Sequence, residues 1–575
     1  MPAIKRAVVF LFLLTLATSI ACASLSTNIP TTAPPAETDS ATITPTETID
    51  GSTVSPEAET ETETPIDPAS SPDGSESIAG RITESGTNAP VPYAFAQTRN
   101  SEGVVVTVLS NQDGEFQFTD LTPGRYSITA HGFGYRRSLA QAIETEPASG
   151  LNIQLELMPE TDIAAQTSGA EWLSLLPDSE ETRQFILDCQ GCHQLGWPRQ
   201  TFGGWPTADQ WETSIEKMHE YYGPQSGFPI IGPMDIPQTA AWLARYLTND
   251  VVPPRPLPIA AEAQTMRLTE YDFPGNGPHD LVLDAGGQVI VTGMFTDDMY
   301  SLDPTTGEFT RYDLPGNANP RAVEIDADGI WWIVFGNRHQ IARFDPQTEE
   351  LTTYPIAMYA HSIALDPDGN AWANGHFKAN PGKVIRIDSQ DGTVQEFDIP
   401  DNNTANLAGL PISYDLRIDG DGTVWGSDLN WNRIYRLDPK TGEVVHYELP
   451  ESASGPRRFD FDADGNLWIP EFSGGRLAMF DPDQFTFTEW DTPTRNAGPY
   501  VVKVDKQRNH VWIGYATANR VARFDPVAET FVEYPLPTAF ALIRHMAIDE
   551  VTGDVWFSYQ HVPTAQDRVA RLETS

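Results

Sequence analysis

Asp462-Ala463-Asp464-Gly465-Asn466-Leu467-Trp468 is the stretch that decides the fold, because versions of it recur along residues 266–575. Each copy joins a turn containing acidic residues to a strand that begins near an aromatic side chain. The first aspartates of the copies stand 40 to 53 residues apart, at Asp284, Asp326, Asp366, Asp419, Asp462, Asp505 and Asp549. The aromatic position holds Trp332, Trp372, Trp425, Trp468, Trp512 and Trp556, with Ile290 in the first copy.

Each repeat has room for four short strands. A third strand ends in Asp-Pro or a similar pair, and a fourth carries an aromatic residue (Tyr312, Tyr354, Phe397, Tyr447, Trp490 and Tyr534). Four strands in about 40–45 residues are typical of a propeller blade. The last repeat stops after its third strand at Leu572, whereas an orphan strand, Met266 to Asp272, precedes the first repeat. Pairing these two strands would leave no open edge in the ring, so we expect a closed seven-bladed β-propeller over 266–575.

The inner strands should begin at the mouth of the central channel. The residue five before each repeated aspartate is large and polar in every repeat: His279, Arg321, His361, Tyr414, Arg457, Tyr500 and Arg544. We call these seven residues the ring. A second set, three positions after the aromatic, includes Asp428 and Glu471. Three arginines at one mouth favour an anionic or carboxylate-bearing ligand. The alternative is that arginines and acids pair with each other and fill the channel.

The repeats resemble the virginiamycin B lyase family through Pro278-His279, the stretch that ends in Glu471, and turns such as Lys440-Thr441-Gly442-Glu443. The resemblance implies a seven-bladed propeller, a magnesium ion, and a ring histidine followed fourteen residues later by a glutamate. That pairing is broken here, because Arg457 precedes Glu471, whereas His279 and His361 precede Gly293 and Gly375. Lyase activity and Mg²⁺ therefore remain only as the alternative, and we expect no other metal.

Cys189-Gln190-Gly191-Cys192-His193 reads Cys-x-x-Cys-His, the attachment sequence of a c-type haem. Two thiols can bind the haem vinyl groups, and the adjacent His193 can ligate the iron. Of the three cysteines in the chain, only these two lie outside the N-terminal export signal. A disulfide, a thioredoxin-like redox pair or half of a zinc site are the other readings. The cysteine count excludes a four-cysteine zinc site, and no βαβ pattern surrounds the motif.

Residues 171–249 predict three helices: Glu180 to Cys192, one capped at Thr207, and one opened by Pro237. Three helices around this motif resemble a small all-α monohaem cytochrome c domain. The second axial ligand is expected to be Met218, with Met234 as the alternate, and His219 or an open site as a third reading.

Residues 77–160 alternate apolar and polar residues between turns and predict a small β-sandwich. They resemble the carboxypeptidase regulatory-like family through Gly80-Arg81-Ile82 and Asp113-Gly114-Glu115-Phe116, which implies a spacer or a carbohydrate-facing module. Residues 250–265 form a proline-rich linker.

The N-terminus predicts export. Residues 1–22 combine a basic start, a short apolar run and a lipobox-like sequence that ends at Cys22, the expected lipidation site. Cleavage after Ala21-Cys22-Ala23 is the rival reading. Residues 23–76 are acidic and rich in Ser, Thr and Pro, so we expect a disordered tether.

The net charge of −44 argues against nucleic-acid binding and limits membrane contact to a lipid anchor. We thus expect a multidomain, mainly β protein of the cell envelope: a propeller, a small all-α cytochrome c domain and a β-sandwich. Its expected function is haem c electron transfer, as an oxidoreductase whose propeller binds a small, anionic substrate and passes electrons to the haem and then to a redox partner in the envelope. The alternatives are a metal-dependent streptogramin (virginiamycin B) lyase and a non-catalytic docking protein.

Overall fold

A computed structural model describes residues 76–144, 148–226, 228–377, 381–400, 412–561 and 566–574. The predicted export signal, the tether up to residue 75 and Cys22 lie outside the described residues. In the described part, no helix is long and apolar enough to cross a bilayer.

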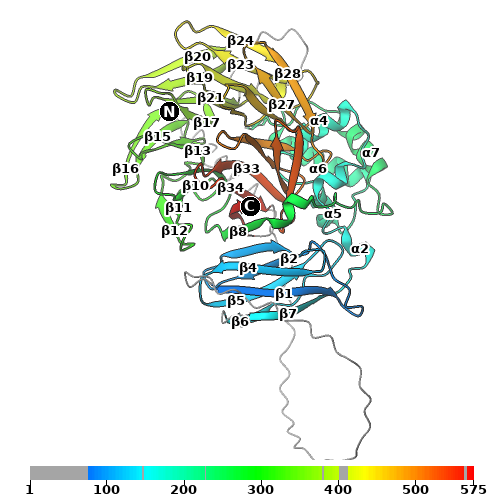
Figure 1. Cartoon of the computed structure of the whole chain (residues 1–575). Helices are drawn as coiled ribbons and strands as arrows, with labels where there is room; N and C mark the ends of the chain where they lie inside the picture. Colours follow the sequence, from blue (N-terminus) through cyan, green and yellow to red (C-terminus); the bar gives the residue numbers. More distant parts are fainter. Residues whose placement is uncertain are drawn as a thin grey trace, which may run out of the picture. The chain divides into compact units, whose positions relative to one another are not determined.

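Six four-stranded antiparallel sheets form blades one to six (Figure 1). In chain order from the inner strand outward they are β9 (Pro278–Leu283), β10 (Val289–Gly293), β11 (Asp298–Leu302), β12 (Phe309–Asp313); β13 (Pro320–Ile325), β14 (Trp331–Phe335), β15 (Gln340–Asp345), β16 (Glu350–Pro355); β17 (Tyr359–Leu365), β18 (Ala371–Phe377), β19 (Gly382–Ile387), β20 (Val394–Ile399); β21 (Ser413–Ile418), β22 (Val424–Asp428), β23 (Arg433–Leu437), β24 (Val444–Glu448); β25 (Asp460–Phe461), β26 (Leu467–Glu471), β27 (Arg476–Asp481), β28 (Thr486–Asp491); β29 (Pro499–Asp505), β30 (His510–Tyr515), β31 (Arg520–Asp525) and β32 (Thr530–Pro535).

Blade seven closes the ring as the sequence predicts. Its strands are β33 (Ala541–Ile548), β34 (Val555–His561), β35 (Arg568–Glu573) and the orphan strand β8 (Arg267–Asp272). β8 pairs antiparallel with β35. Tyr271 of β8 stacks on Trp556 with ring centroids 5.9 Å apart, which is the place that the fourth-strand aromatic takes in other blades, as Tyr354 does on Trp332 at 5.8 Å.

The repeated sequence is a turn that clamps its own tryptophan. Asp462 Oδ1 accepts hydrogen bonds from the backbone N–H groups of Asp464 and Asn466, both at 2.9 Å, and Oδ2 accepts from Trp468 Nε1 at 2.9 Å. Gly465 between them has φ +88°, which favours glycine. The same aspartate–tryptophan bond recurs at Asp326–Trp332, Asp366–Trp372 and Asp419–Trp425. One carboxylate therefore fixes both the turn and the tryptophan that packs the blade.

The predicted β-sandwich is present. One sheet contains β1 (Glu76–Glu84), β4 (Glu115–Leu121) and β7 (Ala148–Leu155), and the other β2 (Phe95–Arg99), β3 (Val105–Leu109), β5 (Arg125–His131) and β6 (Gln141–Glu144). β3 also pairs antiparallel with β8, so the second sheet continues into blade seven as one eight-stranded sheet. The outer edge of blade seven is thereby covered, which the sequence did not predict.

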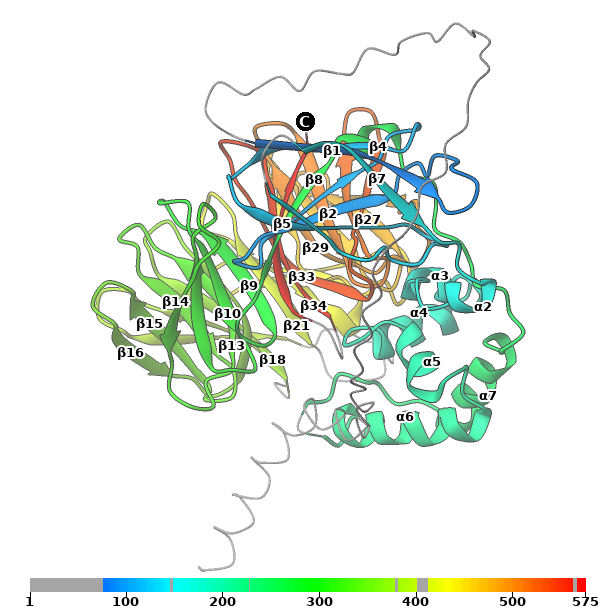
Figure 2. The ribbon, with the colours of Figure 1, turned by 90° about the horizontal axis from the view of Figure 1, so that it is seen from below.

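Between sandwich and propeller lie α2 (Glu160–Ile163), α3 (Gly169–Leu173), α4 (Glu180–Cys189), α5 (Gly196–Phe202), α6 (Ala208–Tyr222) and α7 (Ile236–Tyr246), followed by the short 3₁₀ helix η1 (Ala261–Thr265). Figure 2 shows α3 to α7 gathered into one cluster. Thr207 caps α6 in a capping box with Gln210, and Pro237 lies in the first turn of α7, as expected.

Two helical predictions need correction. The helix expected to reach Cys192 ends at Cys189, because the chain turns at Gln190. The helices also do not form a separate core: Phe185 and Trp211 belong to the same hydrophobic cluster as Tyr414 and Tyr500 of the propeller. A sequence pattern shows which face of a helix is apolar but does not identify what covers that face.

Candidate functional site at the propeller mouth

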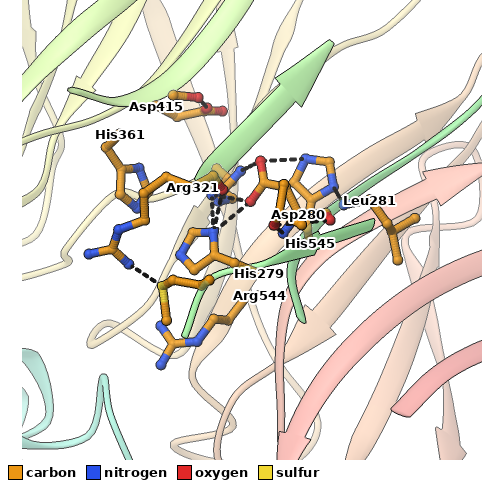
Figure 3. A network of polar contacts seen from close by, with 12 residues as sticks. His279, Asp280, Leu281, Arg321, His361, Asp415, Arg544 and His545 are labelled. Atoms are coloured by element: carbon orange, nitrogen blue, oxygen red, sulfur yellow. Dashed lines mark hydrogen bonds and ion pairs between the residues drawn. The ribbon is translucent and has the colours of Figure 1, made fainter. Parts of the chain in front are cut away.

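The inner strands begin with an irregularity that turns extra side chains into the channel. In six of the seven blades the pairing of the inner strand with the next strand shifts register near the ring position. Such bulges re-aim side chains and occur often beside active sites. In blade one, His279 and the next residue, Asp280, thus both enter one polar network (Figure 3).

The structure brings ring residues from different blades into contact. The imidazole of His279 lies 5.3 Å from that of His361, whose ring is 4.6 Å from Tyr414, measured between centroids. Tyr414 and Tyr500 share a hydrogen bond between their hydroxyl groups, and Arg544 Nη1 donates to Tyr500 Oη at 2.9 Å. Side chains that are far apart in the sequence therefore form one continuous, largely buried cluster.

Aromatic rings hold Arg457 in place. The centre of its guanidinium lies 3.8 Å from the centroid of Phe472, 4.4 Å from that of Tyr500 and 4.8 Å from that of Tyr414. Its Nη1 donates to Tyr414 Oη at 2.9 Å, and only 2% of the residue is exposed. Cation–π contacts stabilise a buried guanidinium without cancelling its charge.

The ring arginines have no carboxylate partners in the described part of the chain. Arg321 instead donates from Nε to Tyr359 Oη at 2.5 Å and contacts Met294 Sδ through Nη1 at 2.9 Å. No ion pair within 4.0 Å joins Arg321, Arg457 or Arg544 to a described acid. No described carboxylate therefore balances the charge of these three arginines.

The two acids of the second set, Asp428 and Glu471, do not pair with the ring arginines. Asp428 pairs with Arg433 at 2.8 Å in its own blade. Burial, with the carboxylate of Glu489, raises the pKa of Glu471 well above its ordinary value and so disfavours its charged form. Neither acid neutralises the ring arginines.

A buried ion pair closes the channel beneath the ring. Arg458 donates to the two carboxylate oxygens of Asp280 at 2.7 and 2.9 Å, although the two residues belong to blades five and one. His545 of blade seven places Nε2 3.7 Å from the same carboxylate. Because this contact spans the channel, the ring lies at a mouth with a floor rather than along an open pore.

Histidines line one side of the mouth, and one of them was missed. His376 of β18 stacks on His361 with centroids 4.2 Å apart. The Nδ1 atoms of His361 and His376 lie 2.9 Å from the carbonyl oxygens of Tyr414 and Ser413, which orients both rings. Burial lowers the pKa of both well below the ordinary value and that of His279 to about 3, so these imidazoles are neutral. The only sequence signal for His376 was its position, one residue after a member of the second set.

The Cys-x-x-Cys-His segment lies on the ring. Gly191 is so close to Arg457 that a Cβ at this glycine would be 3.1 Å from Nη2. Burial alone would lower the pKa of Arg544, but the nearby Tyr500, Tyr414 and Cys192 raise it, so Cys192 lies close to this guanidinium. Gln194 anchors the segment: its Nε2 donates to the carbonyl oxygens of Ala516 and Ala541, both at 3.0 Å. The Cys-x-x-Cys-His segment and the ring, which the sequence predicted as separate sites, thus lie side by side.

The two candidate methionines occupy different places. Met234 packs against the same hydrophobic cluster as Cys189. Two residues before it, the N–H of Gly232 donates to Asp188 Oδ1 at 2.9 Å, which ties the Met234 segment to the end of α4. Met218 is half-buried on α6 and is not part of that cluster.

Comparisons with known proteins support two of the three predicted family resemblances, those of the propeller and of the β-sandwich. Residues 320–575 match the model of the virginiamycin B lyase family, and residues 77–157 match the carboxypeptidase regulatory-like domain. Both predicted resemblances are confirmed over these ranges. The comparison with curated proteins gave no match.

Among solved structures, a streptogramin B lyase is 22% identical, covers 55% of this chain and 100% of its own, and has a TM-score of 0.48. Virginiamycin B lyase from Staphylococcus aureus is 21% identical over 54% of this chain and 99% of its own, with a TM-score of 0.47. The extracellular domain of a hybrid two component system from B. thetaiotaomicron is 17% identical over 54% of this chain and 43% of its own, with a TM-score of 0.43.

Proposed function

We propose that this chain is an exported, lipid-anchored haem c protein of the cell envelope whose propeller mouth binds a small anionic substrate beside the haem, as an oxidoreductase does. Cys189 and Cys192 would hold the haem covalently, and His193 would ligate its iron. The haem would supply one-electron exchange. A redox partner in the envelope would complete the reaction.

The residues around the motif fit such a group. Cys189 is half-buried, and Cys192 is exposed. Cys189 ends a helix against the hydrophobic cluster that also borders Phe228 and Trp242, and such apolar surface suits a porphyrin. The Nδ1 atom of His193 lies 3.3 Å from its neighbour's carbonyl oxygen, and a proton held there would leave Nε2 for the metal.

For the second axial position, the contacts favour Met234 over Met218. Met234 shares the hydrophobic cluster of Cys189, and the bond between Gly232 and Asp188 holds its segment beside the attachment helix. Met218 has neither link.

The positive mouth specifies the substrate class. A buried guanidinium without a counter-charge is costly, and a carboxylate or another oxyanion can supply both the charge and a bidentate acceptor. Arg457 Nε has no hydrogen-bond partner in the described structure and is one donor that such a ligand can use. The role of the ring is to bind this anion and to orient it toward the attachment segment.

The observation that carries the proposal is the contact between Gly191 and Arg457, because it brings the Cys-x-x-Cys-His segment against a ring arginine that would bind the substrate. The test is to produce the full chain together with a haem-attachment system and to record its reduced-minus-oxidised spectrum after denaturation. We expect covalently retained haem that small anionic reductants reduce. Colourless protein with Cys189 and Cys192 joined in a disulfide would refute the proposal.

Lyase activity is the second candidate, because residues 320–575 match that family. Against it, no three His, Cys, Asp or Glu side chains converge as a metal site among the described residues. Magnesium-dependent ring opening of a streptogramin without any change in haem oxidation state would favour the lyase instead.

A further inference from the structure

Tyr414 and Tyr500 form a buried pair of tyrosines that bond to each other and to two arginines. Their hydroxyl groups bond to each other. Arg457 Nη1 donates to Tyr414 Oη and Arg544 Nη1 donates to Tyr500 Oη, both at 2.9 Å. At most 5% of either tyrosine is exposed.

The pair has one proton too many. Each phenol has a single proton to donate, and only one proton can lie between the two oxygens. The second phenol proton needs another acceptor, and within the described residues neither oxygen has a further hydrogen-bond partner. Leaving a donor buried without an acceptor is unfavourable. Losing that proton instead leaves a negative oxygen on Tyr500 that accepts from the Arg544 guanidinium and from the Tyr414 phenol, while Arg457 donates to Tyr414.

We propose that Tyr414 and Tyr500 give up one phenolic proton far more readily than a free phenol and share the other, so that the buried tyrosinate formed in this way is the proton acceptor of the substrate mouth. Its use as a base rests on the proposed function, whereas its charge does not. In the step, an X–H bond of the bound substrate breaks and an O–H bond forms on Tyr500. The electron pair stays on X, near Arg457 and Arg544, and no oxidation state changes.

The charged and titratable groups that face the pair support this charge state. Burial alone would raise the pKa of Tyr500, but the guanidinium groups of Arg544 and Arg457 outweigh it and lower the pKa to about 8. Burial, with the charge of Tyr500, raises the pKa of Tyr414. The other neighbours from the surrounding elements are Arg458, Cys192, His361 and His376, together with Asp415, whose carboxylate accepts from Ser362 and lies 3.6 Å from Arg417.

No other base of the mouth is as well matched to neutral pH. An effective general base has a pKa near the working pH. His279, His361 and His376 have pKa values far below that range, because burial disfavours the imidazolium. The tyrosine pair is therefore the acceptor that a substrate proton would reach, directly or through one water.

The test is an ultraviolet titration of tyrosinate in the full chain, subtracting the double variant Tyr414→Phe/Tyr500→Phe from wild type. We expect one tyrosine to titrate near pH 8 in wild type and to be lost in the double variant. Arg544→Met should move the transition up by about one pH unit or more, since an opposite charge nearby is removed. The control is Tyr435→Phe, a buried tyrosine of blade four bonded to Ser413, which should leave the transition in place.

If no tyrosine titrates below the ordinary value of about 10, the inference is wrong. Arg544→Met also covers the case in which the double variant does not fold, because an unchanged transition in that variant alone refutes the assignment. The titration needs no haem. Colourless protein that keeps the transition would refute the proposed function and support the tyrosinate.

Discussion

Replacing Asp280 by Asn tests whether the buried ion pair holds the floor of the mouth. Asp280 accepts two hydrogen bonds from Arg458, whose side chain is 1% exposed, and lies 3.7 Å from His545. The variant leaves the guanidinium buried without a counter-charge, which typically costs about 3–5 kcal/mol. We expect a value near the lower end, because Asn keeps one oxygen acceptor. The assay is urea unfolding of the full chain, followed by tryptophan fluorescence.

The control is Asp313→Asn. Asp313 also pairs with an arginine, Arg311, at 2.9 Å, but its side chain is 82% exposed. Water and salt screen such a pair, so its loss should cost less than about 1 kcal/mol. Equal losses in the two variants would refute the reasoning that burial sets the magnitude.

The same pair predicts a pH dependence. Burial alone would raise the pKa of Asp280, but Arg458, His545 and His279 lower it below its ordinary value. A carboxylate with a depressed pKa in the folded state stabilises the protein above its unfolded pKa, and this contribution is lost as the pH falls. The difference in stability between wild type and Asp280→Asn should therefore shrink below about pH 4. A constant difference down to strongly acidic pH would contradict this.

Three further predictions concern the haem and its substrate. Replacing Cys189 and Cys192 together by Ser should abolish haem staining of the denatured protein, and retained stain would show attachment elsewhere. Met234→Ala should change the spectrum of the reduced haem, whereas Met218→Ala should not; the reverse result would assign the axial ligand to Met218. Arg457→Met should weaken binding of small carboxylates about 10–100-fold in calorimetric titrations, since a charged hydrogen bond is lost, and unchanged affinity would exclude Arg457 from the site.

Much of the propeller was predictable because its determinants are local. The aspartate turn, the tryptophan six residues later and the aromatic fourth strand interact within one blade, so their spacing appears directly in the sequence. Closure was predictable as well, because the last repeat lacks one strand and the orphan strand at the other end of the region can complete it. The Cys-x-x-Cys-His motif could be recognised for the same reason, since its residues are adjacent in the chain.

The site was only half predictable. Spacing placed His279 and Arg457 at the mouth, but not the register shift that also brings Asp280 into the channel to meet Arg458. His376 escaped notice because its role depends on stacking against His361 rather than on the repeat.

By itself the sequence determined the seven blades, the closing strand and the Cys-x-x-Cys-His segment, because each depends on contacts between residues near one another in the chain or on a repeat. Only the tertiary structure decided that Gly191 lies on Arg457, that the helices share the core of the propeller, and that Tyr414 and Tyr500 meet between two arginines. Those contacts join elements that are distant in sequence, and their geometry follows from how strands tilt and helices pack, which no local spacing encodes.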